Sequence, residues 1–265
     1  MLVFAAFVPH PIMSIPDVSH GSGATLRRTM RAYRELAAEL YAAQPATIVT
    51  ISAHASGSAR GFSINQRPQL AVTFAKFGNL SDRLSLSNDL GLGYRIKESL
   101  ETTALPVFLT EDQPLDYGTG VALYHLLAAL RPERVRVVPI GTGPGSLDEH
   151  YQFGRAVARH IHISTDRIAV IATGDLSHGA SRGSVAAYSP QAASFNKRIK
   201  KAIEENDVRD ALSIQAAELS AVHECAVRPL SILFGTVSDR NYRTRLLSYE
   251  IASGVGYVAA ALDVR

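Results

Sequence analysis

Three histidines and one glutamate, far apart along the 265-residue chain, are the side chains best suited to chemistry. His10, His54 and His178 each stand at or just after the end of an apolar run that is typical of a β-strand, and Glu224 precedes a later apolar stretch. Open α/β sheets gather their chemistry at the carboxyl ends of their strands. Two imidazoles and a carboxylate are the donor set of non-haem Fe(II) sites, and a further histidine beside them could move protons. We therefore expect a metal centre.

The apolar runs that would position these side chains are short and rich in β-branched residues. They cover 2–8, 46–52, 135–140 and 168–173, with the little polar alternation that is typical of parallel strands buried on both faces. Helical spacing begins at Leu26, returns over about 83–102, 118–130, 147–162 and 191–214, and resumes after His223. Two final strands, 242–250 and 256–263, would form a hairpin. The order predicts an α/β fold, a three-layer αβα sandwich around a mainly parallel mixed sheet.

Composition limits the number of domains, the binding partners and the cellular compartment that we expect. The chain is 46% hydrophobic and has no repeat or Pro/Ser-rich linker, so we expect a single domain over 1–265. A formal charge of +3 is too small to indicate a nucleic-acid partner. The apolar amino terminus stops at His10, which is too short for a membrane span or signal sequence. Cys225 is the only cysteine, which excludes an intramolecular disulfide and fits a cytoplasmic protein.

Each candidate ligand also has an ordinary structural interpretation. His10 precedes Pro11, which favours extended backbone, but it could be a loop histidine without a role, and the same holds for His54. His20, in a Gly/Ser-rich segment, is an alternative ligand. Glu224 could simply cap a helix, and Cys225, one position on, offers thiolate ligation in its place.

His178 closes the segment from Gly174 to His178, in which an apolar strand passes into polar groups. Asp175 could orient an imidazole by a hydrogen bond, and His178 titrates near neutral pH. Serine hydrolysis is the competing chemistry. However, Ser177 adjoins His178 and no Gly-x-Ser-x-Gly turn surrounds the serine, which argues against it.

Six short segments, in order over nearly the whole length, together resemble a known superfamily. They are Val8-Pro9-His10-Pro11, Ile51-Ser52-Ala53-His54, Leu115-Asp116-Tyr117-Gly118-Thr119-Gly120, Gly174-Asp175-Leu176-Ser177-His178, Glu224-Cys225-Ala226-Val227-Arg228-Pro229, and Tyr249-Glu250 with Gly254-Val255-Gly256-Tyr257. The ordered set resembles the class III extradiol dioxygenase superfamily, of the protocatechuate 4,5-dioxygenase β-subunit type. That superfamily also includes the Memo-like proteins and AmmeMemoRadiSam system protein B.

The resemblance implies a non-haem Fe(II) oxidoreductase of aromatic catabolism, which cleaves the ring of a catechol-type diol with O2. It implies that the Fe(II) ligands are His10, His54 and Glu224 and that His178 is the second-sphere acid/base. Asp175 is the catalytic residue that we expect to orient His178. The candidate substrate-binding residues are Tyr117, Thr119 and Tyr188. Ring-cleaving members commonly have histidine where this chain has Tyr117, whose reference pKa of about 10 prevents proton shuttling near neutrality.

Two other functions use the same layout. The chain also resembles Memo-like proteins, which have a cysteine that Cys225 could match. The alternative is therefore a metal-binding redox or protein-interaction module without ring cleavage, with Cys225 as the third ligand. A zinc hydrolase with the same ligands is a third hypothesis. For the oxygenase we expect an aromatic diol and O2 as partners and a homo-oligomer, or a small partner subunit as in some superfamily members.

Overall fold

The computed structural model describes residues 1–18, 26–56, 59–81, 83–184 and 186–264, so His20 lies outside the described residues. The strands are β1 (Leu2–Val8), β2 (Thr47–Ser52), β3 (Phe62–Asn65), β4 (Gln69–Thr73), β5 (Arg83–Asn88), β6 (Val107–Thr110), β7 (Arg136–Gly141), β8 (Ile168–Thr173), β9 (Tyr242–Ala252) and β10 (Val255–Val264). The helices are α1 (Arg27–Ala43), α2 (Leu90–Leu100), α3 (Tyr117–Leu126), α4 (Leu147–Ile163), α5 (Ala192–Glu205), α6 (Val208–Leu212), α7 (Ala216–Val222) and α8 (Val227–Val237). Short 3-10 turns occupy Ile12–Ser14, Ala75–Phe77 and Pro132–Arg134.

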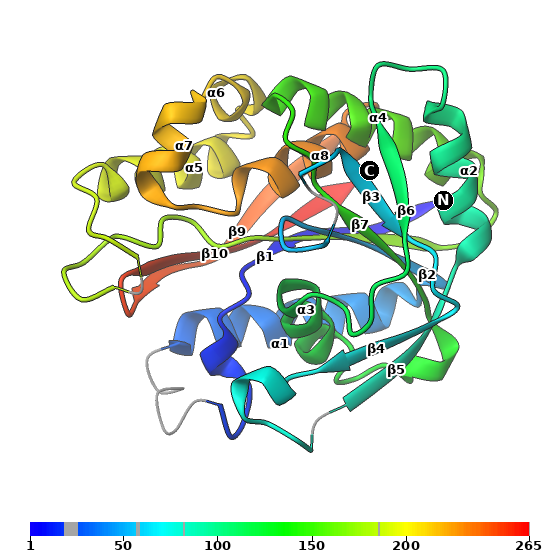
Figure 1. Ribbon diagram of the computed structural model, residues 1–265, viewed down its shortest axis with the longest axis horizontal. Coiled ribbons are helices and arrows are strands. Elements are labelled where there is room, and N and C mark those ends of the chain that lie inside the picture. The colour runs from blue at the N-terminus through cyan, green and yellow to red at the C-terminus, as the bar shows by residue number, and fades with distance from the viewer. Residues whose placement is uncertain (19–25, 57–58, 82, 185, 265) are drawn as a thin grey trace.

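A ten-stranded mixed sheet runs through the described part of the chain (Figure 1). Its order is β4-β5-β7-β2-β8-β1-β10-β9, and β3 pairs with both β7 and β6. The central strands β7, β2, β8 and β1 are parallel, whereas β10 joins β1 and β9 in antiparallel register. The predicted mainly parallel mixed sheet and its terminal hairpin are confirmed.

Helices cover both faces of the sheet, as Figure 1 shows. Helices α1 and α3 pack on one face, where Tyr33, Leu36 and Val121 join the buried side chains of the strands. Helices α2, α4, α5 and α8 pack on the other, through residues such as Phe153 and Leu233. Every residue of β2 and of β8 is buried, which explains why their sequences lack polar alternation. The three-layer αβα arrangement is confirmed.

The register of three parallel strands positions the candidate site. Thr173, the last residue of β8, pairs with Val8 at the end of β1 and with Ser52 at the end of β2. Because the last residues of the three strands are paired with one another, the segments that follow them begin side by side at the carboxyl-terminal edge of the sheet. These segments carry His10 and His54, together with the loop after β8.

Some predicted elements differ in the structure. The helix expected over 83–102 is a strand, β5, followed by α2, and Asp89 separates them by accepting a hydrogen bond from the Leu92 N–H at 3.1 Å. The helix expected over 191–214 is interrupted at Asn206, whose backbone is left-handed (φ 57°) and ends α5. The short strands β3, β4 and β6 were not predicted, because four or five residues carry too little periodicity.

No helix within the described residues combines the length and the apolar character needed to cross a membrane.

Candidate metal centre

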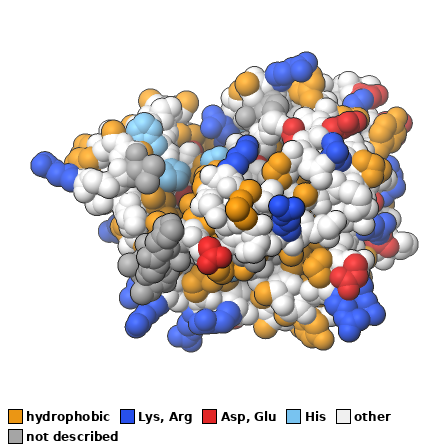
Figure 2. All heavy atoms as spheres, turned by 60° about the horizontal axis from the view of Figure 1, so that its bottom comes forward, with side chains coloured by type: hydrophobic (Ala, Val, Ile, Leu, Met, Phe, Trp, Pro, Cys, Tyr) orange, Lys and Arg blue, Asp and Glu red, His pale blue; other side chains and the backbone are white. Residues whose placement is uncertain are grey.

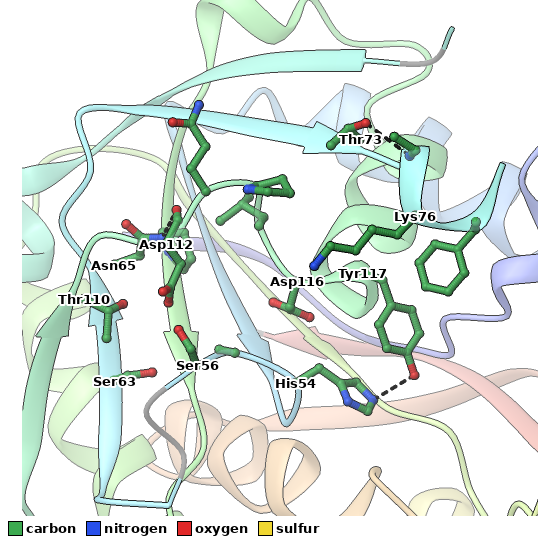
Figure 3. A pocket seen from close by; sticks show the side chains of 17 residues that line it. His54, Ser56, Ser63, Asn65, Thr73, Lys76, Thr110, Asp112, Asp116 and Tyr117 are labelled. Carbon is green, nitrogen blue, oxygen red and sulfur yellow. Dashed lines mark hydrogen bonds between the residues drawn. The ribbon is translucent and has the colours of Figure 1, made fainter. Parts of the chain in front are cut away.

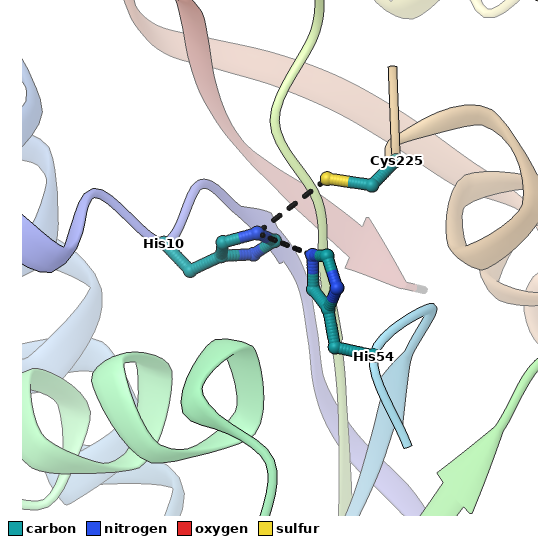
Figure 4. A group of neighbouring side chains, drawn as sticks. All are labelled: His10, His54 and Cys225. Carbon is teal, nitrogen blue, oxygen red and sulfur yellow. Dashed lines mark hydrogen bonds between the residues drawn. The ribbon is translucent and has the colours of Figure 1, made fainter. Parts of the chain in front are cut away.

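Two imidazoles and one thiol meet at the edge of the sheet (Figure 4). The Nε2 atom of His10 lies 3.1 Å from Nε2 of His54 and 3.5 Å from Sγ of Cys225. The three donor atoms lie within 4.8 Å of one another, and no other trio of His, Cys, Asp or Glu in the described ranges does so. Nitrogens each about 2.1 Å from one ion are roughly 3.0–3.4 Å apart at bond angles of about 90–110°. The separation of the two histidine nitrogens therefore fits a single shared ion, and the Cys225 sulfur lies beside them.

Hydrogen bonds fix the buried His10 ring and leave Nε2 available. The His10 backbone N–H donates to Oδ1 of Asp175 at 2.8 Å, and Nδ1 of the ring lies 2.9 Å from the Thr173 hydroxyl oxygen. When Nδ1–H donates to Thr173, the lone pair of the neutral ring is on Nε2, which faces the other donors. The His54 backbone N–H donates to the Ser52 hydroxyl at 3.1 Å, so both histidines are tied to strand ends.

Cys225 is tied to the β8 loop through its backbone and its sulfur. Its N–H donates to the Asp175 carbonyl at 3.1 Å, and the Asp175 N–H points at Sγ at 3.2 Å. Gly174 makes this approach possible, because a Cβ there would lie 2.5 Å from Cα of Ala226 and 2.6 Å from the Cys225 carbonyl oxygen. Glycine at this position therefore brings the third donor to the histidines.

The electrostatics of the three donors suit a cation. Burial lowers the pKa of His10, and burial followed by the neighbouring His10 lowers the pKa of His54 to about 4, so both rings are neutral at neutral pH. Burial, and then Asp175, raises the pKa of the Cys225 thiol. A bound cation would lower the pKa of the Cys225 thiol again, because it stabilises the thiolate directly. Two neutral imidazoles and a thiolate fit a first-row transition metal or zinc.

The structure departs from the predicted ligand set at Glu224. Its Oε2 atom accepts hydrogen bonds from the backbone N–H groups of Ala226 and Val227 at 2.6 and 2.7 Å. Glu224 thus caps the start of α8, the structural interpretation considered for it from the sequence, and its carboxylate is not part of the convergent group. Its role as a ligand stays a prediction, one that this arrangement does not favour over Cys225.

Asp175 connects the metal donors to His178. Its Oδ2 atom lies 3.5 Å from Nε2 of His10 and 3.9 Å from Nε2 of His178, whose Nδ1 contacts the His223 carbonyl. Burial lowers the pKa of His178, but Asp175, the His223 carbonyl and Glu224 outweigh it, so the net shift is upward. For Asp175, burial raises the pKa, but the nearby His10 and His178 lower it overall. The pair can therefore hold a proton beside the donors.

The three predicted substrate-binding residues have different surroundings. The Tyr117 hydroxyl lies 3.1 Å from Nε2 of His54, so this side chain reaches the donors. Thr119 is buried, and its hydroxyl donates to Asp116 at 2.7 Å as part of the cap of α3. Tyr188 is 52% exposed, with the Arg182 guanidinium over its ring, and it lines neither of the cavities at the site. Only Tyr117 is placed to contact a ligand near the metal donors.

Two cavities adjoin His54 on different sides. The larger, of about 560 Å³, is lined by His54, Tyr117 and Phe77, together with polar residues that include Lys76 and Asn65 (Figure 3). The smaller, of about 360 Å³, is lined by both His54 and Cys225 and by residues that follow β7 and begin α8. In the space-filling view, histidine side chains gather in one part of the face drawn (Figure 2).

Comparison with known families agrees with this arrangement. Residues 4–260 match the family described as the catalytic LigB subunit of aromatic ring-opening dioxygenase. The chain belongs to the LigB family. The match extends from β1 to β10, so it includes all three donors. Metal dependence is general in LigB dioxygenases, and the convergent donors of this member are in keeping with it.

Similar proteins extend the comparison without naming a substrate. This LigB-family chain is 24% identical to Protein CA_C1420 of Clostridium acetobutylicum over 97% of its own length. The match covers 56% of that protein, so the chain spans little more than half of the curated relative. A crystal structure of uncharacterized protein JW3007 from Escherichia coli K12 has the same fold, with a TM-score of 0.66 and 18% identity over 98% of this chain and 99% of that one.

Sequence reasoning missed two residues that contribute to this LigB site. Thr173 ends an apolar strand, and its register with Val8 could have indicated a partner for a residue that follows β1. Arg228 is the second residue of the apolar helix α8, where a charged side chain is uncommon beside buried neighbours. The roles of Thr173 and Arg228 become clear only when the strands and helices adjacent to them are known.

Proposed function

We propose that this protein is a metal-dependent oxygenase that opens the ring of a catechol-type diol, with Fe(II) held by His10, His54 and Cys225. The observation that carries the proposal is the convergence of three donor atoms beside a cavity that has room for an aromatic ring. Membership of the LigB family supports oxygenase chemistry in general. Bound at these donors, Fe(II) would supply a meeting point for the diol and O2 and a route for charge between them.

The protein's own residues would bind and orient the diol. Tyr117 lines the larger cavity beside His54, and its ring can lie against an aromatic substrate while its hydroxyl donates a hydrogen bond. Burial raises the pKa of Tyr117, so the phenol remains a donor and does not carry protons near neutrality. Phe77, on the same wall, supplies apolar surface.

Proton transfer falls to His178 and Asp175. His178 would accept the proton that the diol loses on binding and return one to the ring-opened product. Asp175 would orient the imidazole and stabilise its protonated form, which is consistent with the raised pKa of His178. Because Asp175 also contacts His10, a change in the protonation of His178 is felt at the metal donors.

A second function is favoured by two specific observations. Cys225 takes part in the convergent group, and Glu224 is engaged at the start of α8. A thiolate among the donors suits a metal-binding redox or protein-interaction module without ring cleavage, since thiolates prefer softer ions than ferrous iron. We keep this function as the alternative.

An oxygen-uptake and absorbance assay with a panel of catechols separates the candidates. The protein is loaded anaerobically with Fe(II), and we expect oxygen consumption together with a coloured product for at least one diol. His178→Ala should retain iron but lose turnover by about 10²–10⁴-fold. Equal turnover in that variant would remove the role of His178. No oxygen uptake with any diol would favour the redox module, and turnover under argon would favour a hydrolase.

A further inference from the structure

Arg228, beside the metal donors, is a cation without a partner in the part of the chain that the structure describes. It lies in the first turn of α8, and the structure shows no ion pair or hydrogen bond between it and any other described residue. Its Nε atom is shielded from solvent and has no hydrogen-bond acceptor within the described ranges. Buried polar groups in folded proteins are almost always satisfied, so an unsatisfied guanidinium nitrogen needs a specific explanation.

The cavity that Arg228 lines is next to the donors. Its volume is about 360 Å³, and its wall also includes His54 and Cys225, two of the three convergent residues. Ala53, Thr142 and Gly143 complete this part of the wall. A ligand held here would contact Arg228 at one end and the metal donors at the other.

Glu224 does not neutralise Arg228 by direct contact. Its carboxylate also lines the cavity, but no oxygen of it lies within 4.0 Å of the Arg228 nitrogens, and Oε2 is taken by two backbone N–H groups of α8. Burial raises the pKa of Glu224 and lowers that of His150, and the positive charge of Arg228 acts downward on both, so its charge reaches both groups through space. The guanidinium therefore keeps its own donors free for an incoming anion.

We propose that Arg228 is an anion-binding residue that holds the carboxylate of a small ligand in the cavity beside His54 and Cys225. A guanidinium presents parallel N–H donors that match the two oxygens of a carboxylate, and such charge-assisted bonds are stronger than neutral ones. The cavity has room for one small ring attached to that carboxylate. This subsite is separate from the larger cavity in which the proposed function places the diol ring, so binding without turnover tests it alone.

Calorimetric titration of the 265-residue protein with benzoate tests the proposal. Benzoate should bind the wild type, and Arg228→Gln should weaken its binding by about tenfold or more. Arg228→Lys, which keeps the charge but loses the two-donor fork, should give an intermediate affinity. Benzamide has the same shape without the charge, so its weaker binding should change little in Arg228→Gln.

A matched control separates the two cavities. Lys76 is a cation of the larger cavity, so Lys76→Gln should leave benzoate binding unchanged if the smaller cavity is the site. Equal benzoate affinity in wild type and Arg228→Gln, or loss of binding in Lys76→Gln alone, overturns the proposal. Inorganic phosphate that binds as tightly as benzoate and also depends on Arg228 would contradict the carboxylate assignment in favour of a simple anion. Unfolding curves of each variant verify that the fold persists.

Discussion

The Nε2 atoms of His10 and His54 face each other at 3.1 Å, although these residues are 44 positions apart in the chain. Two protonated rings could not share this position, because like charges at such a distance repel strongly in a buried site. Neutral rings present two lone pairs to the same point. The Cys225 sulfur lies 3.5 Å from Nε2 of His10, so a soft donor stands beside the two nitrogens.

Cys225→Ser should weaken metal binding by tenfold or more, whereas Glu224→Gln should leave it nearly unchanged. The reason is that the thiol belongs to the convergent group and the Glu224 carboxylate is engaged with α8. Metal content after dialysis against a graded chelator measures both effects. Iron loss in Glu224→Gln together with iron retention in Cys225→Ser would restore the carboxylate as the third ligand.

Thr173→Val should lower metal affinity by about 10–100-fold while keeping the fold. The substitution removes the only described side-chain partner of Nδ1 of His10, so the ring loses the bond that keeps Nε2 directed at the metal position. Thr50→Val on the neighbouring strand β2 is the control, because the buried Thr50 hydroxyl has no hydrogen-bond partner among the residues that the structure describes. Chelator competition should show a change for Thr173→Val alone. Similar affinities in both variants would contradict the positioning role.

The sheet was predictable because its central strands have uninterrupted apolar sequences. The runs at 2–8 and 168–173 coincide with β1 and β8, since strands buried on both faces must be apolar throughout. The helix expected over 83–102 was wrong in its first half. Ser85 and Ser87 alternate there with Leu84 and Leu86, a strand pattern that the helical spacing of the following residues obscured.

The candidate site was predictable in part, for a geometric reason. Strand ends locate His10 and His54, because parallel strands that end level bring their following loops together. Which of two adjacent residues, Glu224 or Cys225, turns inward depends on the backbone at the start of α8 and on the approach of Gly174. A local sequence does not encode that packing, so the sequence alone leaves both alternatives open.

Gly174→Ala should destabilise the protein by about 1–3 kcal/mol and weaken metal binding as well. The new Cβ would meet backbone atoms of Cys225 and Ala226 that have no flexible end to move aside. Gly91→Ala in α2 is the opposite control, since its nearest contact is the end of the flexible Arg95 side chain at 3.3 Å and alanine is the better helix former. Urea unfolding should therefore move in opposite directions for the two variants. Equal stability of Gly174→Ala and wild type would remove the close-approach argument.

His125 should make the folded state less stable as the pH falls. Burial lowers its pKa to about 4, below the ordinary value of 6.5, while its Nε2 lies 2.7 Å from the Ser14 hydroxyl. Between these two values the unfolded chain binds the proton more readily, so stability is complete above pH 6.5 and falls as the pH drops to 4. One pKa unit corresponds to about 1.4 kcal/mol, so the loss approaches about 3 kcal/mol.

His125→Gln isolates this contribution. His10, His54 and His150 also have lowered pKa values, so the variant should keep part of the pH dependence. The measured quantity is the difference in unfolding free energy between wild type and variant across pH 4 to 7, taken from urea titrations. That difference should shift in favour of the variant as the pH drops, because only the wild type then carries a buried neutral His125 that the unfolded chain would protonate. Parallel curves across this range would mean that His125 titrates alike in both states, and burial would not be controlling its charge.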